Sequence, residues 1–276
     1  MSVNFSELSP LDSPYILGEQ QRSGYAQDGH TVVRGLASRG EVAAYRPFIK
    51  EVLEDAAAKR RADGRVSGYG AFFTQVTNLW RLHDGILRFV IAKRFARVAA
   101  ELMGVRAVRL YHDQALFKPP GGKATPWHQD QVYWPLETSH TVTMWMPLTD
   151  VPRSMGTMVF ASASHMHGPL TDLAISEASD TVYAQLVKDR GFRLGTYDLA
   201  AGDATFHSGW TAHATHPNTG TMDREVMTII YYEDGARIVE PVSAMRKIDM
   251  EAFHPGQHPG ERAASVLNPV LYDAGE

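Results

Sequence analysis

Residues 127–134 read WHQDQVYW and place two potential metal ligands, His128 and Asp130, two positions apart. Side chains at i and i+2 of a β-strand point to the same face, so both could chelate one ion while Gln129 points away. His213 suits the third ligand position because turn sequences flank the segment that carries it. Two imidazoles and one carboxylate hold non-haem Fe(II) on one face and leave the other coordination positions open.

Six further histidines compete with this set. Two share the i, i+2 spacing, two lie close to His213 in sequence, and two belong to a Pro/Gly-rich tail. We interpret His165, His167, His207 and His216 as structural or surface residues. His254 and His258, in the tail, are interpreted as solvated.

Arg224 lies eleven residues after His213, at the start of a predicted strand. 2-Oxoglutarate, the co-substrate that activates O₂ at such irons, chelates the metal at one end. Its distal carboxylate can be clamped by a guanidinium through two parallel hydrogen bonds. Alone, Arg224 would be read as the partner of Asp223 or Glu225 on the surface. Together with the three metal ligands it predicts a co-substrate site.

Composition narrows the class of protein. The 276 residues include 27 basic and 31 acidic side chains, a formal charge of −4, and so lack the basic surface that nucleic-acid binding needs. The absence of cysteine excludes disulfides, thiolate nucleophiles and Cys-type zinc sites. No apolar run approaches the roughly 18 residues of a membrane helix, and the first residues lack the features of a signal peptide. We expect a cytoplasmic protein with a small-molecule partner and no nucleic-acid or membrane partner; no pattern indicates an oligomeric state.

Apolar periodicity predicts helices first and strands later. Ser38 and Glu41 form a capping box before a helix over 39–61, and a second helix is predicted over 84–103. A period of two then predicts strands over 31–33, 108–118, 142–148, 157–161, 203–207 and 226–233.

Two segments interrupt or follow this pattern. The polar stretch 170–190 is interpreted as an insertion that acts as a mobile lid, and residues 241–276 as a tail packed on the surface. No repeat or linker divides the chain, so one domain is expected over 1–276. Its parts are a helical region at about 1–105, a core at about 106–235 and a tail at 236–276.

Seven motifs between residues 28 and 232 resemble the phytanoyl-CoA dioxygenase family of Fe(II)- and 2-oxoglutarate-dependent oxygenases, and the resemblance runs from about residue 24 to residue 232. Their order and spacing match that family. They are DGHTVVRGL, LFKPPGG, WHQDQVYW, TMWMPLTDV, MGTMVFASASH, GDATFHSGWTAH and PNTGTMDREVMTIIYY.

The resemblance implies roles for individual residues. His128, Asp130 and His213 would bind iron, and Arg224 would clamp the distal carboxylate with help from the hydroxyl of Thr215. Lys118 matches a lysine near the iron-bound end of the co-substrate. Further residues expected at the same pocket are Gln114, His112 and Trp145.

The resemblance also implies the fold and the reaction. The fold would be mainly β with flanking helices, a double-stranded β-helix of the jelly-roll, cupin-like type. The enzyme would use Fe(II), 2-oxoglutarate and O₂ to oxidise, most simply to hydroxylate, an unactivated C–H bond, with succinate and CO₂ as co-products. Related halogenases replace the carboxylate ligand by a small residue, so Asp130 favours oxygenation.

A specialised-metabolism intermediate is a better substrate candidate than an acyl-CoA, because no basic groove for CoA is present. Two alternatives stay open from the residues alone. One is a non-catalytic, cupin-like protein with a structural metal such as zinc, and the other is a metal-dependent hydrolase or isomerase with His207 or His165 as base. Candidate residues of the substrate pocket are Phe72, Phe73, Tyr133, Trp134, Met144, Met146, Met155, Met158 and Trp210.

Overall fold

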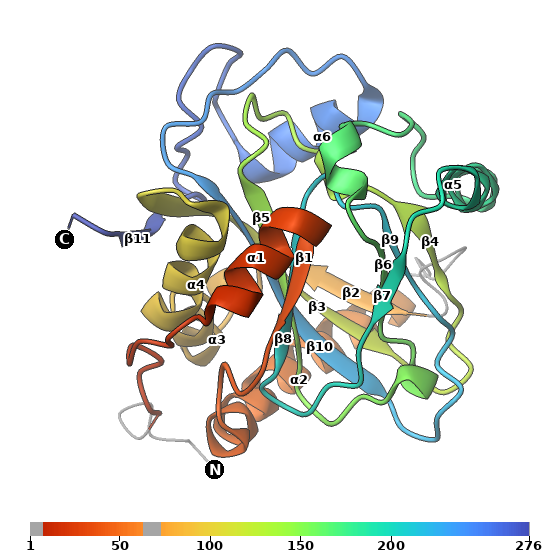
Figure 1. Cartoon of the computed structure of the whole chain (residues 1–276). Coiled ribbons are helices and arrows are strands. Elements are labelled where there is room, and N and C mark those ends of the chain that lie inside the picture. Colours follow the sequence, from red (N-terminus) through yellow and green to blue (C-terminus); the bar gives the residue numbers. More distant parts are fainter. Residues whose placement is uncertain (1–7, 63–72, 276) are drawn as a thin grey trace.

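The computed structural model describes residues 8–62 and 73–275 and places the first helices on one side of a large sheet (Figure 1). These helices are α1 (Glu19–Asp28), α2 (Arg39–Ala62), α3 (Asp84–Val90) and α4 (Lys93–Met103). Two later helices are α5 (Glu177–Asp189), next to the small sheet, and α6 (Ala244–Phe253).

Two antiparallel sheets form the jelly roll. The large sheet has the order β1-β8-β5-β10-β3-β11, with β2 paired to β3, and the small sheet has the order β4-β9-β6-β7. The strands of the large sheet are β1 (His30–Val33), β2 (Thr74–Thr77), β3 (Ala107–Lys118), β5 (Thr141–Pro147), β8 (Ala204–Ser208), β10 (Arg224–Glu233) and β11 (Val270–Asp273). Those of the small sheet are β4 (Thr125–His128), β6 (Met158–Ala161), β7 (Leu194–Thr196) and β9 (His213–Thr215).

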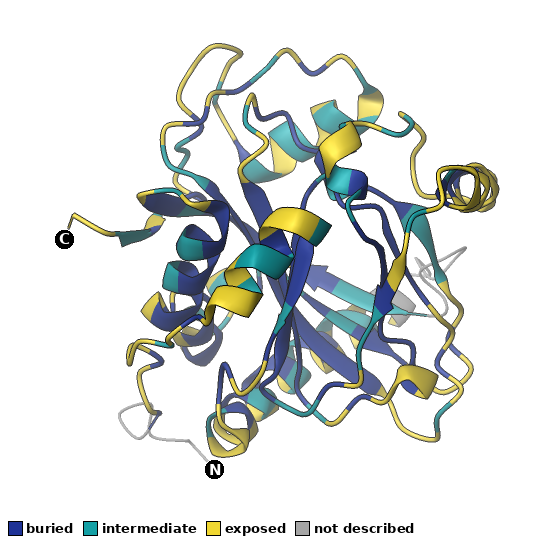
Figure 2. Cartoon of the chain, in the orientation of Figure 1, coloured by how far each residue is buried: buried dark blue, intermediate teal, exposed yellow. Residues whose placement is uncertain are grey.

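The large sheet is buried on both faces, as the dark ribbon in Figure 2 shows. Alternation along β5 assigns its residues to the two faces. Met144 and Met146 pack with the helices in the main core. Thr143 and Trp145 point the other way, into a cavity between the sheets. The prediction that Met144 or Met146 lines the substrate pocket is therefore wrong.

The helix predicted over 39–61 is confirmed as α2, and its cap is the predicted one. The Ser38 amide donates to Glu41 Oε2 at 2.7 Å, and the Glu41 amide donates to Ser38 Oγ at 3.1 Å. The six predicted strands are confirmed within two residues at each end. Short strands such as β7 and β9 were not predicted, because three residues carry too little alternation to be recognised.

The single helix predicted over 84–103 is wrong, since the chain breaks it into α3 and α4. Ala92 adopts ψ 115°, which interrupts the helical hydrogen bonds. Ile91, at this break, is 39% exposed. Each short helix turns its own apolar residues to the core, and a continuous 3.6-residue pattern does not reveal such a break.

The tail is more than a surface segment. β11 joins the large sheet beside β3, and Asn268 is fully buried, donating from Nδ2 to the carbonyls of Leu110 (3.0 Å) and Tyr111 (3.3 Å). His254 is buried rather than solvated, at 1% exposure, whereas His258 is exposed as predicted. Within residues 8–62 and 73–275 no helix combines the length and the apolar composition that crossing a membrane requires.

We predict that Asn268→Ala lowers the free energy of unfolding by on the order of 2 kcal/mol, because two buried carbonyls lose their donor. Urea unfolding followed by circular dichroism measures the change. Val266→Ala is the matched control, since Val266 is 86% exposed and a surface truncation costs less than about 0.5 kcal/mol. Equal unfolding midpoints for the two variants would contradict an integral tail.

Candidate active site

The pairing of β4 with β9 brings the predicted metal ligands together. His128 lies opposite His213 and Thr125 lies opposite Thr215, so three steps along β4 match two along β9. This bulge turns both Thr125 and His128 toward the cavity. Asp130 follows at the start of a 3₁₀ turn, Asp130–Val132, rather than within the strand.

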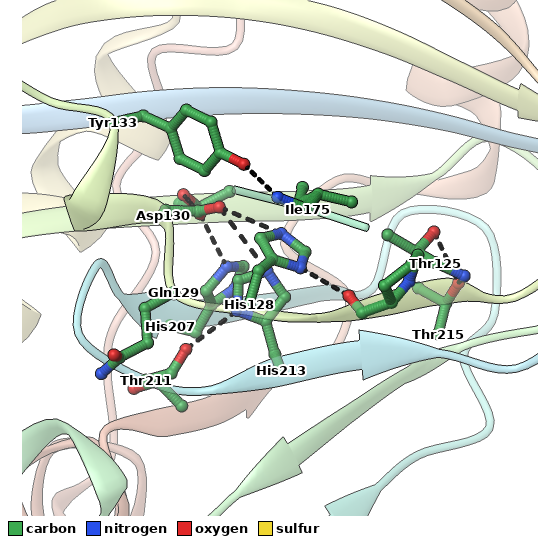
Figure 3. A network of polar contacts seen from close by, with 12 residues as sticks. Thr125, His128, Gln129, Asp130, Tyr133, Ile175, His207, Thr211, His213 and Thr215 are labelled. Carbon is green, nitrogen blue, oxygen red and sulfur yellow. Dashed lines mark hydrogen bonds and ion pairs between the residues drawn. The ribbon is translucent and has the colours of Figure 1, made fainter. Parts of the chain in front are cut away.

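The three predicted ligands face one another (Figure 3). One ligand atom from each of His128, Asp130 and His213 lies within 4.8 Å of the others. Asp130 Oδ1 is 3.4 Å from His128 Nε2 and 3.6 Å from His213 Nε2. A metal ion about 2.1 Å from each donor requires donor separations of about 3 to 3.5 Å. The arrangement therefore fits a divalent ion.

Backbone carbonyls fix the tautomer of both imidazoles. His128 Nδ1 lies 2.8 Å from the Pro126 carbonyl, and His213 Nδ1 lies 2.9 Å from the Thr211 carbonyl. Carbonyls only accept, so each Nδ1 carries the hydrogen and each Nε2 presents a lone pair. Burial, together with the neighbouring His128, lowers the pKa of His213 well below its usual range, which keeps this ring neutral.

Asp130 is oriented by two donors that hold its second oxygen. Thr143 Oγ1 donates to Asp130 Oδ2 at 2.9 Å, and His207 Nε2 lies 3.3 Å from the same oxygen. Burial raises the pKa of Asp130, but interactions with His213, His128 and His207 outweigh this effect and hold the pKa well below the usual range. The carboxylate is thus ionised and turns Oδ1 toward the imidazoles, which is the state that metal binding needs.

Thr143 was not predicted as a site residue, and His207 was considered only as the base of a hydrolase or isomerase. They pair across β5 and β8, and only this long-range register brings them to Asp130. His207 was interpreted as structural from its place in the chain, and the alternation of β8 was the one local signal that could have placed it on the cavity face.

A basic end of the site lies beside Thr215. Arg224 is 1% exposed, donates from Nη1 to the Gly156 carbonyl at 2.8 Å, and lies 5.5 Å from the centre of the Trp145 ring. Lys118 pairs in register with Arg224, and its Nζ donates to Thr215 Oγ1 at 2.6 Å. Burial and, to a smaller extent, the charge of Arg224 lower the pKa of Lys118 to about 6. Lys118 therefore lies beside Thr215 and Arg224, and its expected place near the iron-bound end of the co-substrate stays a prediction.

A cavity of about 290 Å³ joins the metal ligands to the basic end. Of the other predicted residues, Gln114, Trp145, Thr215, Arg224 and His112 line it. Of the predicted substrate contacts, Phe73, Tyr133, Trp134 and Met158 line it, Met155 and Trp210 do not, and Phe72 falls outside the described residues.

Gln129, between two metal ligands, ties the site to the segment after β6. It is fully buried. Its Nε2 donates to the carbonyls of Gly168 (2.9 Å) and Trp210 (2.6 Å), and its Oε1 accepts from the Leu170 amide (2.7 Å) and the Tyr183 hydroxyl (3.3 Å). Every hydrogen-bonding capacity of this amide is used. Gln129 points away from the metal ligands, as predicted, and anchors the segment that leads into α5.

Comparison with known proteins agrees with this geometry. The model of the family described as phytanoyl-CoA dioxygenase matches residues 25–226. The chain is 25% identical over 228 residues to a protein of Stutzerimonas stutzeri described as "Probable alpha-ketoglutarate-dependent hypophosphite dioxygenase", with 78% of each chain covered. It is 24% identical over 233 residues to the ectoine dioxygenase of Bordetella parapertussis, covering 78% of this chain and 75% of that protein.

Solved structures share the fold. The carbocyclase SnoK from nogalamycin biosynthesis superposes with a TM-score of 0.76 at 24% identity, covering 94% of this chain and 99% of that chain. The epimerase SnoN, in complex with Fe³⁺, alpha ketoglutarate and nogalamycin RO, gives a TM-score of 0.70 at 25% identity, covering 92% and 98%. The predicted resemblance and the predicted jelly-roll fold are confirmed.

We predict that Gln129→Ala loosens the segment that Gln129 anchors, because two carbonyls and one amide lose their partner. We expect the free energy of unfolding to fall by on the order of 2 kcal/mol or more, and proteolysis within residues 168–189 to be faster. Timed proteolysis followed by mass spectrometry locates the cuts. Gln185→Ala, at an exposed position of α5, is the control; the same cleavage rate in both variants would rule out the anchoring role.

Proposed function

Because this chain belongs to the phytanoyl-CoA dioxygenase family and is an Fe(II)- and 2-oxoglutarate-dependent dioxygenase, we propose that it hydroxylates a C–H bond of a small organic molecule. The balanced reaction converts substrate, 2-oxoglutarate and O₂ into hydroxylated substrate, succinate and CO₂. The substrate belongs to specialised metabolism.

One observation carries the proposal: the three metal ligands and Arg224 open into the same cavity. We assign His128, Asp130 and His213 as the iron ligands and Arg224 as the clamp on the distal carboxylate of 2-oxoglutarate. A guanidinium suits this role because it binds a carboxylate with two parallel hydrogen bonds. When bound, the iron supplies the activation of O₂, and the protein fixes which coordination positions remain open.

The neighbours of Arg224 hold its guanidinium in a position to bind an anion. Trp145 lies against the guanidinium at 5.5 Å, which limits its rotation. Thr215 Oγ1 faces the same end and is held by Lys118 Nζ and by the Thr125 amide. We assign Thr215 to the distal carboxylate and Lys118 to the support of Thr215, while Gln114 forms part of the cavity wall.

The ligand set favours oxygenation. Asp130 supplies the carboxylate that related halogenases lack, so it leaves no ligand position for a halide. Hydroxylation is the simplest outcome once a substrate hydrogen has been abstracted. The named activities of SnoK and SnoN, carbocyclase and epimerase, are the other outcomes that a different substrate position would favour.

The cavity wall supports a small, largely apolar substrate. Aromatic and aliphatic side chains, among them Phe73, Trp134 and Ile230, form part of the wall. Arg224 is the only Lys or Arg among the described residues of the wall, so a CoA-type polyphosphate finds no further cation there. The complex of SnoN with nogalamycin RO supports a natural product rather than an acyl-CoA.

Two alternatives explain less of the structure. A structural metal needs no buried guanidinium in its cavity. A hydrolase with His207 as base is disfavoured because His207 donates to Asp130 Oδ2, and His165 is absent from the cavity wall among the described residues.

We predict that anaerobic titration of the Fe(II)-loaded protein with 2-oxoglutarate produces a weak visible metal-to-ligand charge-transfer band. Arg224→Lys should raise the dissociation constant of 2-oxoglutarate roughly tenfold or more, because a lysine cannot make the paired hydrogen bonds. Absorbance spectroscopy under nitrogen measures both.

Arg190→Lys, the same substitution at an exposed position after α5, serves as the matched control and should titrate like the wild type. Iron binding without the band, or a His128→Ala protein that consumes 2-oxoglutarate at the normal rate, would refute the proposed function.

A further inference from the structure

One carboxylate on the cavity wall takes no part in binding iron or 2-oxoglutarate. Asp249 lies on α6 and lines the cavity together with Phe253, one turn later. Among the described residues of the wall, Asp130 and Asp249 are the acidic side chains, and Asp130 is already assigned to the metal. Burial raises the pKa of Asp249 to about 7 against the hydrogen bond from Tyr111, and the charge of Asp130 adds to the rise.

The carboxylate of Asp249 is held in place from behind. The Tyr111 hydroxyl donates to Asp249 Oδ2 at 2.9 Å. Tyr111 is fully buried and packs against Trp134, with ring centres 5.3 Å apart. Within the described part of the chain Oδ1 has no hydrogen-bond or ion-pair partner. Arg246, one turn earlier on α6, donates from Nε to the Val132 carbonyl at 3.3 Å and forms no ion pair with Asp249. A fixed carboxylate with one oxygen unengaged is suited to a ligand.

Asp249 and Arg224 lie at opposite ends of the cavity. Arg224 begins β10, and Ile230, six residues later, lies opposite His112 on β3. Six residues of strand span about 20 Å. The ring of Phe253 stacks on His112 with centres 4.2 Å apart and an interplanar angle of 24°. The α6 end of the cavity is therefore acidic and the Arg224 end basic.

Aromatic rings surround the acidic end. Tyr133, Trp134 and Phe253 line the cavity there, and Figure 3 shows the Tyr133 ring close to Asp130. The Tyr133 hydroxyl accepts from the Ile175 amide at 2.8 Å, which holds the ring. Aromatic faces attract cations, and the attraction grows when water is excluded.

We propose that Asp249 binds an ammonium group of the substrate, so that the substrate is an amine with an apolar body. This inference rests on the proposed function and names its substrate class. The amine lies between Asp249 and the aromatic rings, and the apolar body extends past Ile230 toward the metal ligands. The 2-oxoglutarate occupies the other end, where Arg224 selects a carboxylate.

The same charges disfavour anionic substrates. A phosphonate or carboxylate head group at the α6 end would lie against Asp249, and the described wall offers no Lys or Arg there to offset the repulsion. A hydroxyl group could hydrogen-bond to Asp249 but would gain nothing from the aromatic faces. Head-group charge is therefore the property to test.

Three probes share an indole ring and differ in the head group: tryptamine carries an ammonium, tryptophol a hydroxyl and indole-3-propionate a carboxylate. Calorimetric titration of the Fe(II)- and 2-oxoglutarate-loaded protein without O₂ gives their affinities. We expect tryptamine to bind roughly tenfold or more tighter than the other two, as a charge-assisted hydrogen bond provides. Asp249→Asn, which keeps the Tyr111 contact, should remove this preference.

Glu251→Gln, at an exposed position of the same helix, should retain the preference. Equal affinities of the three probes for the wild type, no binding of tryptamine, or a preference that survives Asp249→Asn would each overturn the proposal. The wild-type comparison decides the point even if Asp249→Asn lowers the melting temperature. Loss of the charge-transfer band would instead refute the proposed function, and the head-group comparison does not depend on turnover.

Discussion

The bulged pairing of β4 with β9 is the constraint on which the site depends. It sets His128 opposite His213 and Thr125 opposite Thr215, so one strand pair supplies two of the proposed metal ligands and two hydroxyls near the basic end. A slip of one residue would turn each of these side chains to the other face of the sheet. The pairing of Phe160 with His213 on the other side of β9 fixes the register of β9 itself, and Phe160 is fully buried.

The large sheet orients the carboxylate of Asp130, which follows β4 of the small sheet. Thr143 and His207, which face each other across β5 and β8, hold one oxygen of Asp130 and leave the other toward the imidazoles. Met144 and Phe206, next to them in sequence, pack against the helices. The same strands thus fix the carboxylate on one face and bury apolar surface on the other. Rigidity of the metal ligands follows from the main core.

Local patterns predicted the parts of the site that one short segment determines. The i, i+2 spacing of His128 and Asp130 and the Ser38 cap needed no tertiary information. Thr143 and Asp249, which distant segments bring to the cavity, were missed, and the contact of His207 with Asp130 was not predicted. The place of Lys118 near the iron-bound end of the co-substrate came from the family resemblance alone, and its pairing with Arg224 depends on the long-range register of β3 against β10. The tail was read as a surface segment because side-chain amides such as Asn268, rather than apolar periodicity, bind it to the sheet.

The cost of burying charge explains why the cavity is polarised. Lys118 and Arg224 are buried side by side, an arrangement that is unfavourable unless an anion joins it, and the lowered pKa of Lys118 expresses this cost. At the α6 end a carboxylate is buried beside Tyr111 with its pKa raised, a cost that a cation offsets. The basic end therefore disfavours a cationic ligand, and the acidic end disfavours an anionic ligand. Because the metal ligands lie between the two ends, opposite charges on the ligands direct the co-substrate and the substrate to different sides of the same ion.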